Sequence, residues 1–195
     1  ERADLEAYPR DEERDLALAA EAGVDLVFAP PVGEMYPDGF QTWVDVERLG
    51  AILEGRHRPG HFRGVATVVL KLLTITRPDV VYFGQKDAQQ VEVIRRLIRD
   101  LALEVELRAI ETVRDADGLA LSSRNARLSP AEREQALALP RALATRDAAR
   151  ATAVLREAGL EVDYVEAAPF DPPVLAGAVR VGETRLIDNV PLEAP

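Results

Sequence analysis

The chain has 195 residues, a length that fits one domain or two small ones. Its formal net charge of −10 makes it a poor partner for nucleic acid, so an anionic ligand requires a local positive site. The sequence contains no cysteine, which excludes disulfide scaffolds, thiolate metal sites and cysteine nucleophiles. No apolar run approaches the roughly 18 residues of a membrane span, so we expect no membrane partner. Because of the acidic net charge, we expect no nucleic acid as partner either.

The first part of the chain alternates between charged or amphipathic stretches and short apolar runs. Alternation of this kind predicts helices and strands of a parallel α/β sheet. A basic, glycine-containing loop is expected over residues 55–61, and the outer face of the second amphipathic helix would pair Glu92 with Arg96. The predicted elements are a helix over 9–22, a buried strand over 24–29, an exposed strand over 40–46, a buried helix over 62–76, a buried strand over 80–83, a helix from Val91 and a strand over 104–110.

The pattern changes near Val113, after which helices are followed by a small antiparallel piece. Ser129 and Glu132 form a capping box with proline between them, which predicts a helix from there to about Ala144. The remaining predicted elements are a helix over 150–158, a strand over 161–165, a proline-rich loop over 169–173 and a hairpin over 179–187.

These elements predict an α/β fold with a Rossmann-like parallel sheet over residues 1–112 and a smaller C-terminal α+β lid domain over 113–195. A doubly wound nucleotide site uses the first strand and the loop after it, whereas this chain opens on a helix. We therefore expect the sheet to be incomplete at its N-terminus, with another βαβ unit upstream of Glu1.

A strand running into glycine and then a helix gives the strongest local signal. Gly84-Gln85-Lys86-Asp87 follows the predicted strand over 80–83, at the carboxyl end where open α/β sheets bind ligands. Backbone N–H groups of such a turn favour phosphate, and Lys86 adds a mobile positive charge. The alternative is an ordinary turn with one surface lysine. Because nearly all of the 24 basic residues are arginine, the retained lysine favours function.

Three weaker patterns have structural alternatives, and for the acidic run over 11–15 the structural alternative is favoured. Two hydroxyls and a guanidinium at Ser122-Ser123-Arg124 suit a polyphosphate, but polar loops of this kind are common. Arg58 and His61 could contact an anion, or the histidine could simply cap a helix. The acidic run over 11–15 could hold Mg²⁺, although acids at a helix start also suit its dipole.

Taken together and in order, six motifs resemble the pantothenate synthetase (pantoate–β-alanine ligase) family. The resemblance runs from Glu1 to about Leu139 and resumes from Val162 to Asn189. The motifs are Tyr8-Pro9-Arg10, Leu53-Glu54-Gly55, Arg58-Pro59-Gly60-His61-Phe62-Arg63-Gly64-Val65, Phe83-Gly84-Gln85-Lys86-Asp87-Ala88-Gln89-Gln90, Asp117-Gly118-Leu119-Ala120-Leu121-Ser122-Ser123-Arg124-Asn125 and Thr184-Arg185-Leu186-Ile187-Asp188-Asn189.

The resemblance implies a cytoplasmic, homodimeric enzyme that uses ATP and Mg²⁺ to join pantoate and β-alanine through a pantoyl adenylate. It assigns catalysis to Lys86 and to the Ser122-Ser123-Arg124 run, and a metal contact to Asp15. The implied ATP contacts are Gly84, Gln85, Lys86, Asp87, Val113, Leu121, Ser122, Ser123 and Arg124, and the implied pantoate and substrate contacts are Gln90, Arg58, His61 and Tyr8.

Departures from the family pattern leave an alternative open. A leading His-Xaa-Gly-His segment and an Asn-Pro-Xaa-Gln-Phe stretch are not found in the sequence. Arg14 replaces the acidic neighbour of Asp15, and Gln85 stands where glutamate is usual. The alternative to an active ligase is a catalytically inactive nucleotide-binding remnant or fragment of that enzyme.

Overall fold

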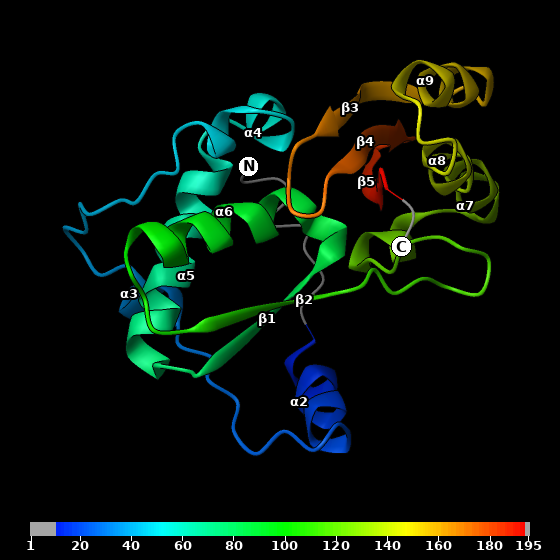
Figure 1. Cartoon of the computed structure of the whole chain (residues 1–195). Coiled ribbons are helices and arrows are strands. Elements are labelled where there is room, and N and C mark those ends of the chain that lie inside the picture. Colours follow the sequence, from blue (N-terminus) through cyan, green and yellow to red (C-terminus); the bar gives the residue numbers. More distant parts are fainter. Residues whose placement is uncertain (1–10, 194–195) are drawn as a thin grey trace. The chain divides into compact units, whose positions relative to one another are not determined.

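The structure is a computed structural model that describes residues 11–193 (Figure 1). The chain divides into two compact units, one ending at Gln41 and the other beginning at Thr42. The domain boundary expected at Val113 stays a prediction. Within the described range, none of the helices is long and apolar enough to cross a membrane.

The first unit contains helices α2 (Glu12–Glu21) and α3 (Val32–Met35). Asp11 caps α2 by accepting a hydrogen bond from the Arg14 N–H at 3.1 Å, and the helix ends before Gly23, as the sequence predicts. The buried strand expected over 24–29 is wrong: the structure assigns no strand there, and Leu26 is 82% exposed. A strand needs a neighbour for its backbone groups, and no described segment pairs with this one.

The second unit contains a parallel pair of strands and an antiparallel sheet. Its elements in chain order are η1 (Leu49–Ala51), α4 (Glu54–His57), α5 (His61–Thr76), β1 (Val80–Gly84), η2 (Gln85–Asp87), α6 (Ala88–Asp100), β2 (Glu106–Ile110), η3 (Ser123–Arg127), α7 (Pro130–Ala136), α8 (Ala138–Leu143), α9 (Ala148–Glu157), β3 (Glu161–Ala168), β4 (Val174–Val181) and β5 (Thr184–Pro191).

The parallel pair is a βαβ unit in which α6 connects β1 to β2. The register runs from Val80 opposite Glu106 to Gly84 opposite Ile110. Apolar faces of α5 and α6 pack together and against the strands in one hydrophobic cluster, so the predicted α/β class is confirmed. The strand β1 is not buried as expected: Tyr82 is 59% exposed, since β2 is its one partner among the described strands.

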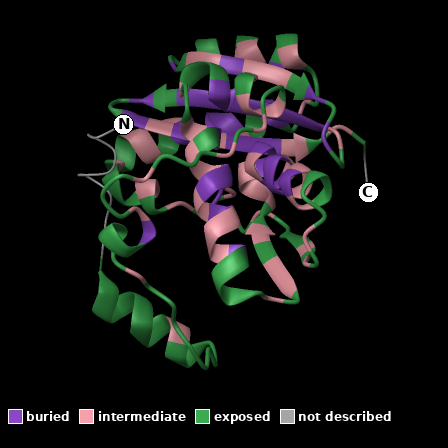
Figure 2. Ribbon diagram, turned by 90° about the vertical axis from the view of Figure 1, so that its left-hand side faces the viewer, coloured by how far each residue is buried: buried purple, intermediate pink, exposed green. Residues whose placement is uncertain are grey.

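The antiparallel sheet has the order β3-β4-β5, with helices α8 and α9 packed against it. Leu139, Leu143 and Leu155 from the helices meet Leu175 and Val179 from β4 in a second cluster. Figure 2 shows the buried residues gathered on these strands and on the helices beside them. The hairpin predicted over 179–187 is thus part of a larger three-stranded sheet.

Three local predictions differ from the structure. Residues 40–46 form no strand, although Val44 and Val46 do pack against the α5–α6 cluster. The loop expected over 55–61 is shorter than predicted: α4 extends to His57, a turn over 58–60 follows, and α5 begins at His61. Glu92 pairs with Arg95 at 2.6 Å rather than with Arg96.

The capping box at Ser129 and Glu132 is present, but the helix that it starts is divided into α7 and α8. Pro140 explains the division because it has no N–H to donate to the carbonyl four residues earlier. After the break at Leu137, α8 packs against β4 and β5.

Candidate functional site

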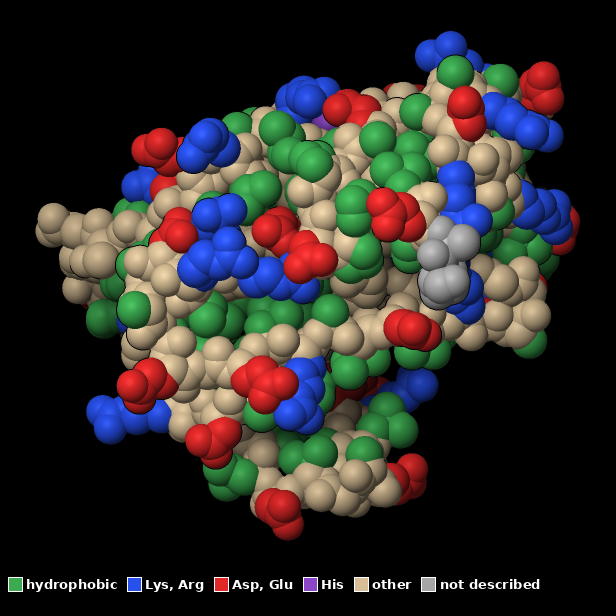
Figure 3. Space-filling view, viewed as in Figure 1, with side chains coloured by type: hydrophobic (Ala, Val, Ile, Leu, Met, Phe, Trp, Pro, Cys, Tyr) green, Lys and Arg blue, Asp and Glu red, His purple; other side chains and the backbone are tan. Residues whose placement is uncertain are grey.

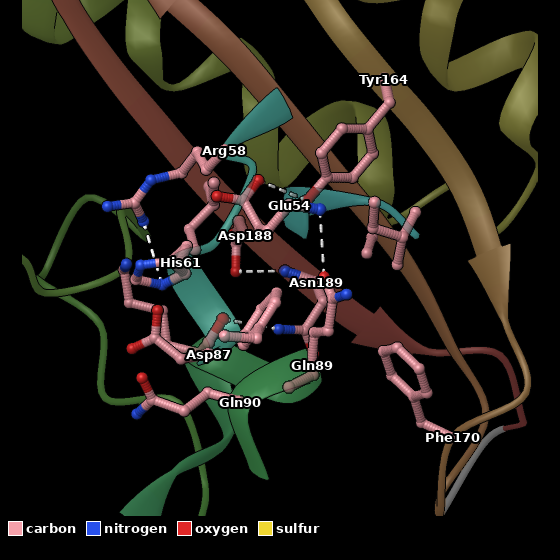
Figure 4. Close-up of a pocket in the computed structure, with 16 residues that line it drawn as sticks. Glu54, Arg58, His61, Asp87, Gln89, Gln90, Tyr164, Phe170, Asp188 and Asn189 are labelled. Carbon is pink, nitrogen blue, oxygen red and sulfur yellow. Dashed lines mark hydrogen bonds between the residues drawn. The ribbon is translucent and has the colours of Figure 1, made fainter. Parts of the chain in front are cut away.

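A pocket in the second unit lies where the turn after β1 meets α4 and the antiparallel sheet. Figure 4 shows Glu54, Asp188 and Asn189 at its centre, with Arg58 and His61 on one side and Tyr164 and Phe170 on the other. The lining residues are Leu53, Glu54, Arg58, His61, Phe62, Lys86, Asp87, Ala88, Gln89, Gln90, Tyr164, Phe170, Ala176, Ile187, Asp188 and Asn189.

A second, smaller pocket adjoins the first. Lys86, Ile187 and Asp188 line both of them. The other lining residues of the second pocket are Leu119, Ala120, Ser122, Asn125, Leu139 and Leu186. The lysine singled out in the sequence therefore lies on the boundary between two cavities.

The turn from Gly84 to Asp87 places Lys86 at that boundary. The strand β1 ends at Gly84, the three residues of η2 follow, and α6 begins at Ala88. Asn189 on β5 contacts this turn: its side-chain amide donates to the Gln85 carbonyl at 2.8 Å and the Lys86 carbonyl at 2.9 Å. Lys86 lies at the carboxyl end of a parallel strand, as predicted.

The neighbouring glutamines Gln89 and Gln90 have different surroundings. Gln89 is buried; its amide donates to the carbonyls of Leu49 and Ile52 at 2.7 and 2.8 Å and accepts from the Glu54 N–H at 3.0 Å. Through these bonds to the backbone, the Gln89 side chain joins α6 to η1 and α4. Gln90 lines the pocket and remains the candidate for contacting a substrate.

Glu54 is a buried carboxylate at the centre of a hydrogen-bond network that lines the pocket. Arg185 donates to its two oxygens at 2.6 and 2.7 Å, and the Tyr164 hydroxyl donates at 2.8 Å. Arg185 also donates to Asp163 at 2.6 Å. The network ties α4 to strands β3 and β5, and so fixes the segment that leads to Arg58.

The ionisation of this network follows from its contacts. Burial by itself would raise the pKa of Glu54, but the hydrogen bonds and charge of Arg185, aided by Tyr164, hold that pKa below its ordinary value. Burial, reinforced by the Glu54 charge, raises the pKa of the Tyr164 hydroxyl, which stays protonated. Although burial opposes it, the pKa of Arg185 is raised by the Glu54 and Asp163 carboxylates.

The basic loop brings two of the predicted anion contacts together. The Nη1 atom of Arg58 lies 3.2 Å from Nε2 of His61, and both residues line the pocket. His61 begins α5 after Gly60, whose φ of 80° favours glycine. Acidic and basic side chains are interspersed over the face shown in Figure 3. Arg58 and Lys86 are basic residues that line the pocket.

The segment from Val113 to Ser122 forms a tight loop beside the second pocket. The Leu121 N–H donates to the Val113 carbonyl at 2.9 Å, which closes the loop. Ser122 caps η3 and lines the second pocket, and Ser123 and Arg124 follow it within η3. Arg114 holds the loop to β5 through two hydrogen bonds to Asp188, at 2.7 and 3.0 Å.

Two predicted site residues belong to other parts of the chain. Asp15 belongs to α2 in the first unit, and Tyr8 lies outside the described residues. Over residues 11–193 no three His, Cys, Asp or Glu side chains gather in a way that could hold a metal ion. The assignment of a metal contact to Asp15 stays a prediction.

The network residues Glu54, Tyr164, Arg185 and Asn189 were not among the predicted site residues. Each bonds to a segment about 100 or more residues away, so no local spacing connects the partners. The only available signal was that Glu54, Arg185 and Asn189 belong to motifs on which the family resemblance rests.

Comparison with known proteins gives a consistent result. Residues 1–191 match the family model described as pantoate-beta-alanine ligase. A pantothenate synthetase of Heliobacterium modesticaldum is 52% identical over an alignment 214 residues long, which covers 97% of this chain and 76% of that protein. One of Moorella thermoacetica is 51% identical, with the same two coverages.

Solved structures agree with the sequence relatives. The crystal structure of pantothenate synthetase from Thermus thermophilus has a TM-score of 0.89 and 46% identity, covering 96% of this chain and 77% of that one. Pantoate-beta-alanine ligase from Francisella tularensis, complexed with beta-gamma ATP and beta-alanine, has a TM-score of 0.89 and 34% identity, covering 100% and 75%.

Proposed function

The chain belongs to the pantoate–β-alanine ligase family, and on that premise we propose that it activates pantoate with ATP at the two adjoining pockets that share Lys86. Pantoate would lie in the first pocket and the triphosphate would extend toward the second. The observation that carries the proposal is the position of Lys86, the residue at which the two substrates would have to meet.

The first chemical step is the transfer of an adenylyl group to a carboxylate. A carboxylate oxygen of pantoate attacks the α-phosphorus of ATP, the bond to the β-phosphate oxygen breaks, and pyrophosphate leaves. Negative charge concentrates around the α-phosphate in the transition state. A positive charge already in place there stabilises the transition state more than the ground state, and the compact, flexible ammonium of Lys86 suits a phosphate whose geometry changes.

The second step forms the amide. The amine of β-alanine attacks the carbonyl carbon of the adenylate, AMP leaves, and the amine proton is released. Holding the adenylate beside the amine makes this step effectively unimolecular. The Francisella tularensis relative, whose structure is a complex with beta-gamma ATP and beta-alanine, supports the use of ATP and β-alanine.

The residues of the first pocket have the chemistry that a small hydroxy acid requires. Arg58 and His61 provide donors for a carboxylate or hydroxyl, and Gln90 can both donate and accept. The oxygens of Glu54 accept hydrogen bonds from Arg185 and Tyr164, and the charge of Arg58 also helps to hold the Glu54 pKa below its ordinary value. Tyr8 is proposed as a further pantoate contact on the family resemblance alone.

The nucleotide contacts are proposed on both sides of Lys86. Ser122 lines the second pocket, and Ser123 and Arg124 continue from it along η3. The remaining proposed contacts are Gly84, Gln85, Asp87, Val113 and Leu121. Mg²⁺, a homodimer and a cytoplasmic location are proposals that rest on the family resemblance.

The test is pantoate-dependent release of pyrophosphate from ATP by this chain. We expect release with pantoate alone, and AMP together with pantothenate when β-alanine is added. ATP binding without any pyrophosphate release would favour the alternative, an inactive nucleotide-binding remnant.

A further inference from the structure

Two consecutive residues of β5 hold the segments on either side of the second pocket. Asn189 binds the turn over 85–87, and Asp188 binds the loop over 113–122. We propose that Asn189 is a positioning residue for Lys86: it fixes the turn that carries the lysine, while Asp188 fixes the opposite loop. The proposal deepens the function proposed above and rests on it for the role of Lys86.

Asn189 is buried, and its side-chain amide contacts the turn directly. The residue is 5% exposed, and its side-chain nitrogen donates to two successive carbonyls, those of Gln85 and Lys86. Its own backbone N–H donates to Asp188 Oδ1 at 2.8 Å. One side chain thus ties the three-residue turn to a strand more than 100 residues away along the chain.

The turn has few other restraints. It is a single 3₁₀ turn between β1 and α6, and such turns have poorer hydrogen-bond geometry than an α-helix. In the described structure, Asp87 at the start of α6 forms no side-chain cap. A flexible lysine can deliver its charge to one place only if its backbone is held, so the Asn189 amide determines how well Lys86 is placed.

The loop over 113–122 is held by Asp188, the residue that precedes Asn189 in β5. Asp188 has a side chain only 2% exposed and binds Arg114 in a two-bond pair. Arg114 also donates to the Gly118 carbonyl at 3.2 Å, within the loop that leads to Ser122. The spacing between Lys86 and Ser122 across the second pocket is therefore set by one strand, β5.

The first experiment measures the turn itself and needs no activity. Hydrogen exchange of the backbone amides over residues 85–88 is compared between the parent chain, Asn189→Ala and Asn189→Asp, which keeps the size of the side chain but removes its donors. Gln135→Ala is the matched control. It also removes a hydrogen bond from a side-chain amide to a backbone carbonyl, that of Ala158 at 3.0 Å, but Gln135 does not line the pocket.

We expect exchange over residues 85–88 to become about tenfold faster in both Asn189 variants and to stay unchanged in the control. Unchanged exchange in a folded Asn189 variant would overturn the proposal whatever the activity. Faster exchange in a chain that releases no pyrophosphate would refute the proposed function and leave the positioning of the turn established.

The second experiment is a double-mutant cycle on pyrophosphate release. Asn189→Ala should lower kcat roughly tenfold with the KM for ATP changed less than about twofold. In a Lys86→Ala background the same change should cost less than about twofold, because the lysine through which Asn189 acts is gone. Equal losses in both backgrounds would show that Asn189 does not act through Lys86.

Discussion

Replacing the buried carboxylate of Glu54 with an amide tests the network beneath the pocket. Glu54→Gln keeps the size of the side chain but removes a charge that faces Arg185 at 2.6 and 2.7 Å. At an effective dielectric constant of about 20, unit charges about 4 Å apart attract by about 4 kcal/mol. Removing one partner of a buried pair costs about 3–5 kcal/mol.

The structure places this substitution at the lower end of that range. Arg185 keeps a second carboxylate, Asp163, at 2.6 Å, so it is not left without a counter-charge. We expect Glu54→Gln to lower the free energy of unfolding at pH 7 by about 3 kcal/mol. In a chain of this size, that corresponds to a melting temperature lower by roughly 6–12 °C.

The effect should depend on pH in a defined direction. The folded-state pKa of Glu54 lies below its ordinary value of 4.5. The stabilisation from ionised Glu54 is therefore complete above about pH 4.5 and is lost as the pH falls through the folded-state pKa. The difference in stability between parent and Glu54→Gln should be constant from neutral pH down to about pH 5.5 and should shrink below about pH 4.5.

Urea unfolding at several pH values is the assay, with Glu166→Gln as the matched control. Glu166 also joins α4 to β3, through Arg56 at 2.9 Å, but the two side chains are 40% and 54% exposed. An exposed pair of this kind contributes no more than about 1 kcal/mol. A loss below about 1 kcal/mol for Glu54→Gln at pH 7, or a difference that grows as the pH falls, would refute this reasoning.

Two further substitutions test the packing around the same network. Gly55→Ala should lower the free energy of unfolding by about 1–3 kcal/mol in urea, because the new Cβ collides with the Gly50 carbonyl, whereas Gly64→Ala, where no atom lies within 4 Å, should be neutral or stabilising. Equal effects of the two would contradict the close approach. Tyr164→Phe removes one donor to Glu54 and should lower the urea midpoint by the equivalent of about 1.5 kcal/mol without changing the slope; an unchanged midpoint would show that this hydrogen bond contributes nothing.

Local patterns in the sequence were sufficient for the elements whose signals are local. The capping box at Ser129, the apolar run of α5 and the glycine that ends β1 each require only a few neighbouring residues, and the structure contains all three elements. The strand expected over 24–29 failed because its apolar run predicts a strand only if another strand pairs with it, and none of the described strands does.

The candidate site shows the same division. Lys86 could be found because a strand, a glycine and a helix follow one another in the chain. The partners that hold it could not, since Asn189 and the Glu54–Arg185 pair act across more than 100 residues. Gln89 shows a further limit of the sequence. Its side-chain amide could contact a polar substrate, but in the structure it donates hydrogen bonds to the carbonyls of Leu49 and Ile52.

The central claim is that Lys86 acts on the transition state of adenylation and not merely on ATP binding. The direct measurement compares Lys86→Ala with the parent chain in two assays, ATP affinity and pantoate-dependent pyrophosphate release. Removing one preplaced group that stabilises developing charge costs roughly 10²–10³ in rate, so we expect a loss of that size in pyrophosphate release. ATP affinity should weaken by less than about tenfold. Equal losses in affinity and in rate would contradict the claim and assign to Lys86 a binding role alone.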